Sequence, residues 1–373
     1  MADIGASGTG DGDAGTSADT VEAGEGSVSV QPRRPTLRSR TLDELVAWAE
    51  SRGFERYRAS QIAGWLYNRP VTRVEDMHNV PEAVRAALLQ DFDCSTPRIV
   101  KESRSTDGTV KLLVGLADDK VVESVIIPRE ERLTLCISSQ VGCALDCAFC
   151  ATATLGLLRN LDPSEIVAQV LFARAVAAPH PLTNFVFMGM GEPLANYERL
   201  VRAIEIMTAR WGLGISPRRI TVSTVGLVPQ LERLVRETNV HIAVSLNAAR
   251  DELRDRLMPV NRRWPLEELI GACKRLDLPR RKRVTFEYVL LDGVNDTLRD
   301  ADDIIRLCRG IPVKINLIPF NPFPGAAFCR PPDERVVAFQ ERLLAAGVHA
   351  TIRKSRGRDI EAACGQLAAA ASA

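Results

Sequence analysis

The stretch GCALDCAFCATATLG, residues Gly142–Gly156, contains three of the nine cysteines of the chain, Cys143, Cys147 and Cys150. Their spacing is C-x3-C-x2-C. Structural zinc sites and complete cubane iron–sulfur sites usually take four protein ligands. Three thiolates on one short loop are suited to hold three irons of a [4Fe–4S] cluster and to leave the fourth iron open to a small molecule. A zinc site completed by a distant cysteine, and a group of inert buried thiols, are the alternative interpretations.

The composition is ordinary, but the charge is unevenly distributed. The chain has 373 residues, of which 46% are hydrophobic and 25% are charged, as in many globular enzymes. Residues 1–32 contain six acids and no Lys or Arg, and because the net charge is only +1, the rest of the chain carries about +7. Basic clusters at 218–219, 262–263, 280–283 and 353–358 favour a phosphate-rich partner.

The sequence also indicates where the protein works. It contains no apolar run of about 20 residues, so we expect no membrane-spanning helix. The N-terminal segment has neither a basic start nor an apolar core, so we expect no secretory signal. Nine cysteines in such a chain favour metal-binding or catalytic thiols over a disulfide framework. We therefore expect a cytoplasmic protein.

Four segments differ in their pattern. Residues 1–40, rich in Gly, Ala, Ser, Thr and Asp, predict a disordered acidic tail. Residues 41–97 predict a small helical domain, with Thr41 as the cap of its first helix. Residues 98–131 predict a β-rich connecting segment with Asp-Gly and Asp-Asp turns. Residues 132–368 alternate between strand and helix patterns, which predicts a parallel α/β sheet.

Six strand–helix units fit an incomplete (βα)6 barrel better than a barrel of eight. An open doubly wound sheet is the alternative, but its first strand should be followed by a Gly-rich phosphate turn. Here the cysteine stretch stands in that place. The predicted strands are LTLCIS (133–138), NFVFMG (184–189), RRITVST (218–224), HIAVSLN (241–247), RVTFEYVL (283–290) and VKINLIPF (313–320).

Small and polar residues follow several of these strands. Barrel enzymes place their chemistry at the carboxyl ends of the strands, so we expect these residues to line a cofactor site. Glu192 is suited to receive a charged amino group. A single Ser or Asn in a loop is usually only a turn or cap residue, but their repetition at equivalent places supports the site. The predicted cofactor-binding residues are Gly191, Glu192, Ser223, Ser245, Leu246, Asn247 and Asn321.

The cysteine spacing after a first barrel strand resembles that of the radical S-adenosylmethionine (SAM) superfamily. The resemblance implies that Cys143, Cys147 and Cys150 bind a [4Fe–4S] cluster and that SAM itself occupies the open iron. It also implies that reduction of SAM by the cluster releases a 5′-deoxyadenosyl radical.

A closer resemblance, over residues 41–368, is to the RlmN/Cfr family of radical-SAM RNA adenine methyltransferases. It implies an incomplete (βα)6 radical-SAM barrel, a helical RNA-binding N-terminal domain and two SAM molecules per turnover. The family often has Ser-Leu-His where this chain has Ser245-Leu246-Asn247. The resembling motifs are LCISSQVGCALDCAFCATATLGLLRNL (135–161), MGMGEPLAN (188–196), RRITVSTVGLVP (218–229), INLIPFNPFPGA (315–326) and RGRDIEAACGQL (356–367).

The same resemblance implies three catalytic residues. Cys364 matches the cysteine whose thiol first accepts the methyl group and then carries it to the adenine. Cys136 matches the cysteine that attacks Cys364, forms a transient disulfide and releases the methylated base. Glu123 matches the general base that removes the proton from the adenine carbon. Without the resemblance, each would read as an ordinary core, surface or strand residue.

The family methylates adenine at C2 or at C8. The motif at 315–326 resembles the C2 type, which acts on an adenosine in the peptidyl-transferase centre of 23S rRNA and on an adenosine beside the anticodon of some tRNAs. An electron donor such as flavodoxin or ferredoxin is implied as well. The alternatives are a C8 methyltransferase, a non-catalytic iron–sulfur RNA-binding protein, and a radical-SAM enzyme that acts on a peptide or small metabolite.

Overall fold

The computed structural model describes residues 34–69, 73–279 and 282–368. The predicted acidic tail lies outside the described residues up to Arg33, and so do Arg280 and Arg281 of one basic cluster.

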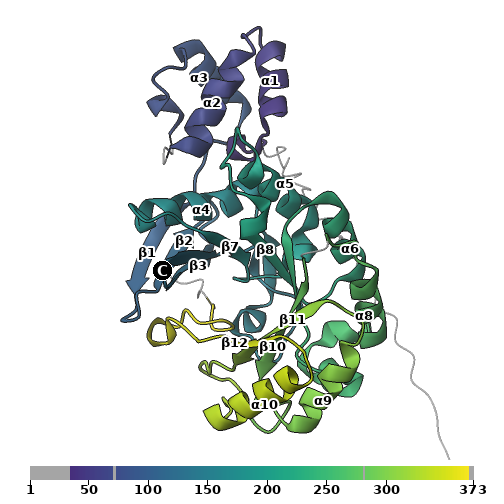
Figure 1. Ribbon diagram of the computed structural model, residues 1–373. Coiled ribbons are helices and arrows are strands. Elements are labelled where there is room, and N and C mark those ends of the chain that lie inside the picture. Colours follow the sequence, from purple (N-terminus) through teal and green to yellow (C-terminus); the bar gives the residue numbers. More distant parts are fainter. Residues whose placement is uncertain (1–33, 70–72, 280–281, 369–373) are drawn as a thin grey trace, which may run out of the picture. The chain divides into compact units, whose positions relative to one another are not determined.

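The N-terminal domain consists of three helices, α1 (Leu42–Ser51), α2 (Tyr57–Asn68) and α3 (Glu82–Asp91), drawn in purple in Figure 1. Thr41 caps α1 as predicted: its side chain accepts from the backbone N–H of Glu44, whose carboxylate accepts from the N–H of Thr41 at 2.9 Å. This reciprocal capping box satisfies two backbone donors at the helix start.

The domain begins earlier than the sequence predicted. Composition predicts that residues 34–40 belong to the disordered tail, but Leu37 is only 2% exposed within the helical core. Its N–H donates to Asp93 O at 3.0 Å, and the Tyr67 hydroxyl donates to Arg40 O at 2.8 Å. Leu37 fills the space between the helices, which local composition does not reveal, so the predicted boundary at residue 40 is wrong by about seven residues.

The connecting segment forms an antiparallel extension of the main sheet. Its strands β1 (Arg98–Arg104), β2 (Val110–Gly115) and β3 (Val121–Arg129) pair in succession, and β3 pairs with the first barrel strand, β4 (Arg132–Cys136). The two predicted turns lie between them.

The barrel part confirms the predicted six strand–helix units. Strand order in the sheet is β1-β2-β3-β4-β7-β8-β9-β10-β11-β12, and β4 to β12 are parallel in chain order. The order never reverses, which excludes the doubly wound alternative. The strands after β4 are β7 (Asn184–Phe187), β8 (Ile220–Thr224), β9 (His241–Ser245), β10 (Val284–Leu290), β11 (Val313–Pro319) and β12 (Ala350–Ile352).

Helices cover the outer face of this sheet, as Figure 1 shows, and β1 and β12 form its two unpaired ends within the described residues, so the barrel is open. Among the described residues, none of the helices is both long enough and apolar enough to span a membrane. The helices are α4 (Pro163–Ala177), α5 (Tyr197–Thr208), α6 (Val228–Glu237), α7 (Asp251–Leu257), α8 (Leu266–Arg275), α9 (Leu298–Leu307) and α10 (Asp333–Ala345).

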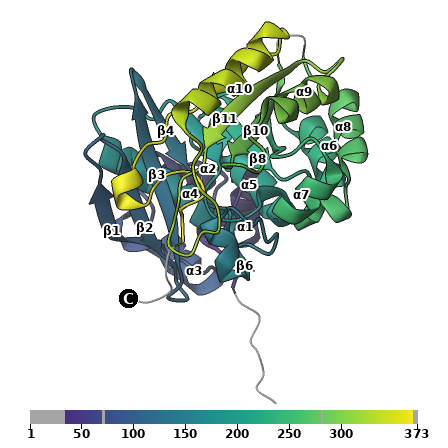
Figure 2. The same ribbon diagram turned by 90° about the horizontal axis from the view of Figure 1, so that it is seen from below.

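Two further segments lie outside this sheet and form the site. A separate hairpin, β5 (Gln140–Gly142) and β6 (Leu157–Asn160), frames the cysteine stretch between β4 and α4. After β12 the chain continues in a loop that Figure 2 shows in yellow beside β3 and β4. We call this segment, residues 356–368, the C-terminal loop.

Candidate active site

The cysteine loop, residues 142–156, is closed at its base by the β5–β6 hairpin. The N–H of Cys143 donates to Gly156 O at 2.8 Å. Gly142 has a φ of +76°, and a Cβ at this position would lie 1.8 Å from Gly156 O. Only glycine fits such a positive φ and so close a backbone approach. Backbone contacts therefore shape the loop that carries the three cysteines.

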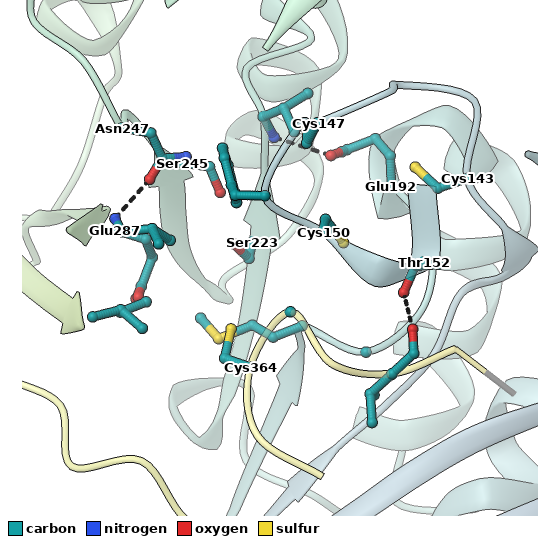
Figure 3. Close-up of a pocket in the computed structure, with 18 of the residues that line it drawn as sticks. Cys143, Cys147, Cys150, Thr152, Glu192, Ser223, Ser245, Asn247, Glu287 and Cys364 are labelled. Atoms are coloured by element: carbon teal, nitrogen blue, oxygen red, sulfur yellow. Dashed lines mark hydrogen bonds between the residues drawn. The ribbon is translucent and has the colours of Figure 1, made fainter. Parts of the chain in front are cut away.

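The thiols of Cys143, Cys147 and Cys150 are partly buried and line one cavity (Figure 3). Burial raises the pKa of Cys143 to about 11 and raises that of Cys147, and the neighbouring thiols add to both shifts. Metal binding stabilises the thiolate form and offsets this effect. In the part of the chain that the structure describes, no three His, Cys, Asp or Glu side chains are placed to hold a single metal ion. A cubane bonds each thiolate to a different iron, so its three ligands need not converge on one point.

The cavity lies at the carboxyl ends of the parallel strands, where the sequence predicted it. It has a volume of about 1020 Å³, including the part that is open to solvent. Most predicted site residues meet there, whereas Leu246, Cys136 and Glu123 do not line it. The predicted residues that line the cavity are Cys143, Cys147, Cys150, Gly191, Glu192, Ser223, Ser245, Asn247, Asn321 and Cys364.

Glu192 is held rigidly after β7. Its side chain is 3% exposed, and its two oxygens accept from Leu194 N at 3.0 Å and Val225 N at 2.9 Å. Burial raises its pKa to about 7. Gly191 is required next to it, because its φ is +96° and a Cβ would lie 2.5 Å from Gln140 Cβ. Gln140 in turn accepts from Glu192 N at 2.7 Å, so the hairpin and β7 fix the carboxylate together.

Asn247, which stands where the resemblance led us to expect histidine, has its side chain engaged by the protein. Its φ is +56°, a left-handed conformation that Asn tolerates. Its Oδ1 accepts from Val289 N at 2.8 Å, and its Nδ2 lies 3.1 Å from Met258 Sδ. The preceding Leu246 is fully buried, and its N–H donates to Glu287 O at 2.9 Å. The side chain of Asn247 therefore connects β9 to β10 at the cavity wall.

A buried arginine that the sequence did not point to supports these strand ends. Arg254 is 1% exposed and donates to Val225 O at 2.7 Å, Ser245 O at 3.1 Å and Asn261 Oδ1 at 2.9 Å. Burial lowers its pKa to about 10. The guanidinium lies near enough to Cys147 to lower the pKa of that thiol. It ties the loops after β8 and β9 to the wall beside the cysteine loop.

The C-terminal loop brings Cys364 against the cysteine loop. The N–H of Ala151 donates to Gly365 O at 2.8 Å, and Asn321 Nδ2 donates to Cys364 O at 3.1 Å. Figure 3 shows Cys364 on the side of the cavity that faces Ser223 and Cys150. Its side chain is exposed, and the solvent that reaches it is that of the cavity.

Cys364 lies close enough to Cys136 to influence the pKa of its thiol, although 228 positions separate the two residues in the sequence. Cys136 is 7% exposed at the end of β4. Surrounding protein raises the pKa of Cys136 to about 12 and also raises that of Cys364, and a charge on Cys364 further raises that of Cys136. The guanidinium of Arg353 lowers the pKa of both thiols. The structure thus places the two predicted redox cysteines close enough to Arg353 for its charge to act on both.

Comparison with known proteins agrees with this geometry. Residues 137–308 match the model of the radical SAM superfamily, and residues 36–93 match that of the ribosomal RNA large subunit methyltransferase N-terminal domain. The dual-specificity RNA methyltransferase RlmN of Geobacter sulfurreducens is 51% identical over 333 residues, which cover 89% of this chain and 91% of that protein. The RlmN protein of Anaeromyxobacter sp. (strain Fw109-5) is 50% identical over 343 residues, covering 90% and 91% of the two chains.

The chain belongs to the RlmN family of radical SAM RNA methyltransferases. A crystal structure of a radical SAM methyltransferase from Sphaerobacter thermophilus superimposes with a TM-score of 0.86 at 46% identity, covering 91% of this chain and all of that one. Radical SAM enzymes use a [4Fe–4S] cluster and SAM, and the three-cysteine cavity fits both. The match from residue 36 also agrees with the early start of the helical domain.

Glu123, predicted from the RlmN resemblance to be the general base, has both of its carboxylate oxygens engaged by other groups of the protein. It lies on β3 and is 6% exposed. Lys111 Nζ lies 2.9 Å from its Oε1, and the N–H of Ala368 donates to its Oε2 at 3.0 Å. Lys111 also donates to Glu361 O at 3.3 Å. The observed contacts of Glu123 therefore hold the C-terminal loop, at a position outside the cavity wall.

The turn between β1 and β2, residues 105–109, anchors the other end of the C-terminal loop. Ser105 Oγ donates to Asp359 Oδ1 at 2.6 Å, and Gly357 N donates to Asp107 Oδ2 at 2.9 Å. Partial burial acts to raise the pKa of Asp107, but the hydrogen bonds it accepts lower it to about 2. The hydrogen bond from Ser105 also lowers the pKa of Asp359, so both carboxylates are ionised acceptors at neutral pH. We call this segment the anchoring turn.

Sequence reasoning did not assign a role to the residues that support the site. The sequence predicts Asp107 as part of a turn, but its partner lies 250 positions away. Gln140 stands inside the motif at 135–161, and its position there predicts no separate role. Arg254 belongs to a helix with alternating charges, and no pattern marks one of them as buried. For these residues the local sequence carries no signal, because their role depends on which distant backbone groups they meet.

Proposed function

We propose that this protein transfers a methyl group to C2 of an adenine in 23S rRNA and of an adenine beside the anticodon in tRNA, consuming two SAM molecules per turnover. The name of its RlmN relatives, dual-specificity RNA methyltransferases, supports two RNA substrates. The motif at 315–326 supports the C2 position. The observation that carries the proposal is the placement of Cys364 in the same cavity as the three cysteines of the cysteine loop.

Cys143, Cys147 and Cys150 would hold the [4Fe–4S] cluster. The cavity residues after the strands, Gly191, Glu192, Ser223, Ser245, Asn247 and Asn321, with Leu246 beneath them, would form the SAM pocket. When bound, cluster and SAM supply a 5′-deoxyadenosyl radical that is able to take hydrogen from a methyl thioether. The protein supplies that thioether, because the thiol of Cys364 takes a methyl group from the first SAM.

Release of the product falls to Cys136. Its thiolate attacks the sulfur of Cys364, so that an S–S bond forms while the bond between that sulfur and the transferred carbon breaks. The electron pair of the broken bond remains with the carbon and takes up a proton, which completes the methyl group on the base. The burial that raises the pKa of Cys136 keeps its thiol protonated until this step, and the Arg353 guanidinium favours the thiolate.

Glu123 remains the proposed base, and this role requires a change in its present contacts. Its carboxylate becomes available to the adenine only when the contacts to Lys111 and to the N–H of Ala368 are exchanged. Movement of the C-terminal loop, which carries Cys364 and ends at Ala368, would achieve this. The proposal therefore couples proton removal to movement of the loop.

Two further parts of the proposal concern the surroundings of the enzyme. A one-electron donor such as flavodoxin or ferredoxin would reduce the cluster. The cytoplasm is the expected compartment, because it holds both RNA substrates and keeps thiols reduced.

The test is direct. Holoenzyme, SAM and reductant are incubated with 23S rRNA fragments and with tRNA that lack the modification, and the nucleosides are compared with 2-methyladenosine and 8-methyladenosine standards by mass spectrometry. We expect 2-methyladenosine in both RNAs and none with Cys364→Ala. Formation of 8-methyladenosine, or of no methylated adenosine with active wild-type enzyme that cleaves SAM, contradicts the proposal.

A further inference from the structure

Glu287, in the middle of β10, is a buried carboxylate on the cavity wall to which neither the sequence analysis nor the proposed function gives a task. It is 4% exposed and lines the cavity with Ser245 and Cys364, as Figure 3 shows. Its Oε1 accepts from Asn316 Nδ2 at 2.8 Å. Its Oε2 is buried and has no hydrogen-bond partner; it forms a long ion pair with Arg353 Nη1, at 3.8 Å, which is beyond hydrogen-bond distance.

A second acceptor in the same cavity is also unsatisfied. Asn321 donates its amide to Cys364 O, but its Oδ1 is buried without a partner. Folded proteins rarely leave buried acceptors unpaired, and the penalty is greatest for a charged group. Only six side-chain atoms in the described residues are in this state, and two of them, Glu287 Oε2 and Asn321 Oδ1, belong to residues that line this cavity. Both atoms are hydrogen-bond acceptors, so a ligand that satisfies them must carry hydrogen-bond donors.

The apolar residues of the cavity wall indicate which class of ligand fits. Phe187, Val289, Ile318 and Phe320 line the cavity, and such apolar walls suit a flat ring. An adenosine moiety combines a purine ring with donors, namely the exocyclic amine and the ribose hydroxyls. Both SAM and the target nucleotide contain this moiety.

We propose that Glu287 is a binding residue for an adenosine moiety, with its Oε2 accepting a hydrogen bond from an exocyclic amine or a ribose hydroxyl. Asn321 Oδ1 accepts from a second donor of the same moiety. This inference rests on the proposed function, because that function is what brings adenosine to the cavity. It adds a residue from β10 to a site that the sequence predicted from the ends of other strands.

The informative variant is Glu287→Gln. Since Asn316 donates to Oε1, the amide oxygen of the glutamine stays at that partner, and its NH₂ group takes the place of Oε2. The variant thus keeps the size of the side chain and reverses the hydrogen-bonding character at the unsatisfied position. Gln230→Ala is the matched control, because Gln230 Oε1 also lacks a partner but does not line the cavity.

Affinity is measured anaerobically on the reconstituted holoenzyme in two arms, by calorimetry with S-adenosylhomocysteine and by fluorescence anisotropy with a labelled tRNA anticodon stem-loop. We expect Glu287→Gln to weaken one of the two by about tenfold, which corresponds to about 1.4 kcal/mol, with no change in Gln230→Ala. A loss confined to S-adenosylhomocysteine assigns Glu287 to the cofactor, and one confined to the RNA assigns it to the target adenosine.

Unchanged affinity in both arms overturns the inference. Iron content and melting temperature report whether the variant is folded. If Glu287→Gln does not fold, Glu287→Asp replaces it: the shorter side chain keeps the charge but does not reach both Asn316 and a ligand, so a loss in one arm is again expected. Wild-type enzyme that binds neither probe would count against the proposed function itself, which keeps the two failures distinguishable.

Discussion

The cysteine loop and the C-terminal loop meet at the same cavity, but different kinds of contact hold them in place. The cysteine loop is framed by its own hairpin, and its backbone closes on itself between Cys143 and Gly156, 13 positions apart. The C-terminal loop depends on side chains of the β1–β3 extension, through Asp107, Ser105 and Lys111, at separations of 250 to 254 positions. A loop shaped by local backbone contacts should tolerate the loss of one side-chain contact, whereas a loop held by distant side chains should not.

The largest expected effect comes from the proposed cluster ligands in the cysteine loop. Changing Cys143, Cys147 or Cys150 to Ala removes one of three thiolates, so the protein should lose its iron–sulfur absorbance and all SAM cleavage. Iron and sulfide content and 5′-deoxyadenosine formation measure this. Cys329→Ala is the control, because Cys329 is exposed and lies outside the cavity. A full cluster in all three variants would remove the basis for treating this loop as the metal site.

The next effect separates the proposed cluster ligands of the cysteine loop from the two proposed redox cysteines, Cys136 on β4 and Cys364 on the C-terminal loop. Cys136→Ala should keep its cluster and still methylate Cys364, but should stall with RNA covalently linked through Cys364, because no thiol remains to break the thioether. Denaturing gels and mass spectrometry of the crosslinked peptide detect this product. Cys364→Ala should form no crosslink, and Cys308→Ala, at a buried position outside the cavity, should behave as wild type. Turnover at the wild-type rate in Cys136→Ala without trapped RNA would make Cys136 an ordinary core thiol.

A smaller effect tests how the C-terminal loop is held. Asp359→Asn weakens the contact to Ser105 in the anchoring turn, so Cys364 should be positioned less well. We expect about a tenfold loss of RNA methylation, about 1.4 kcal/mol of barrier, with unchanged iron content and continued SAM cleavage. The ratio of 5′-deoxyadenosine to methylated adenosine therefore rises. A parallel fall of both products would indicate that the variant perturbs the whole site instead of the loop.

The smallest effect is expected from Asp118→Asn, which is the counterpart, beside the cysteine loop, of Asp359→Asn. Asp118 in the β2–β3 turn is paired with Arg159 on β6 at 2.7 Å, with both side chains about one-quarter exposed. Such partly exposed pairs contribute little, and Arg159 keeps its second partner, Glu165, at 2.8 Å. Asp118→Asn should therefore leave cluster content and methylation within about twofold of wild type. If Asp118→Asn and Asp359→Asn lose equal activity, the two loops do not differ in the way we infer.

The site was predictable where its parts follow one another in the sequence. The three proposed metal ligands lie within eight residues, Glu192 lies five positions after the end of β7, and the six barrel strands each carry their own apolar pattern. Cys364, Cys136 and Glu123 were reached by resemblance alone, because nothing in their local sequence sets them apart. The structure places the first two together, and it gives Glu123 contacts that the resemblance did not suggest.

The sequence by itself determined the order of the strands, the cysteine loop and the caps of helices such as α1, because these depend on neighbours within a few positions of the chain. Only the tertiary structure decided that Leu37 belongs to the helical core, that the side chain of Asn247 is engaged by Val289 and Met258, and that Glu287, which lines the cavity, has a buried oxygen without a hydrogen-bond partner. Hydrogen bonding and burial act through space. A residue's partners are set by how the parallel sheet brings distant strand ends together, and the identity of the residue alone does not name them.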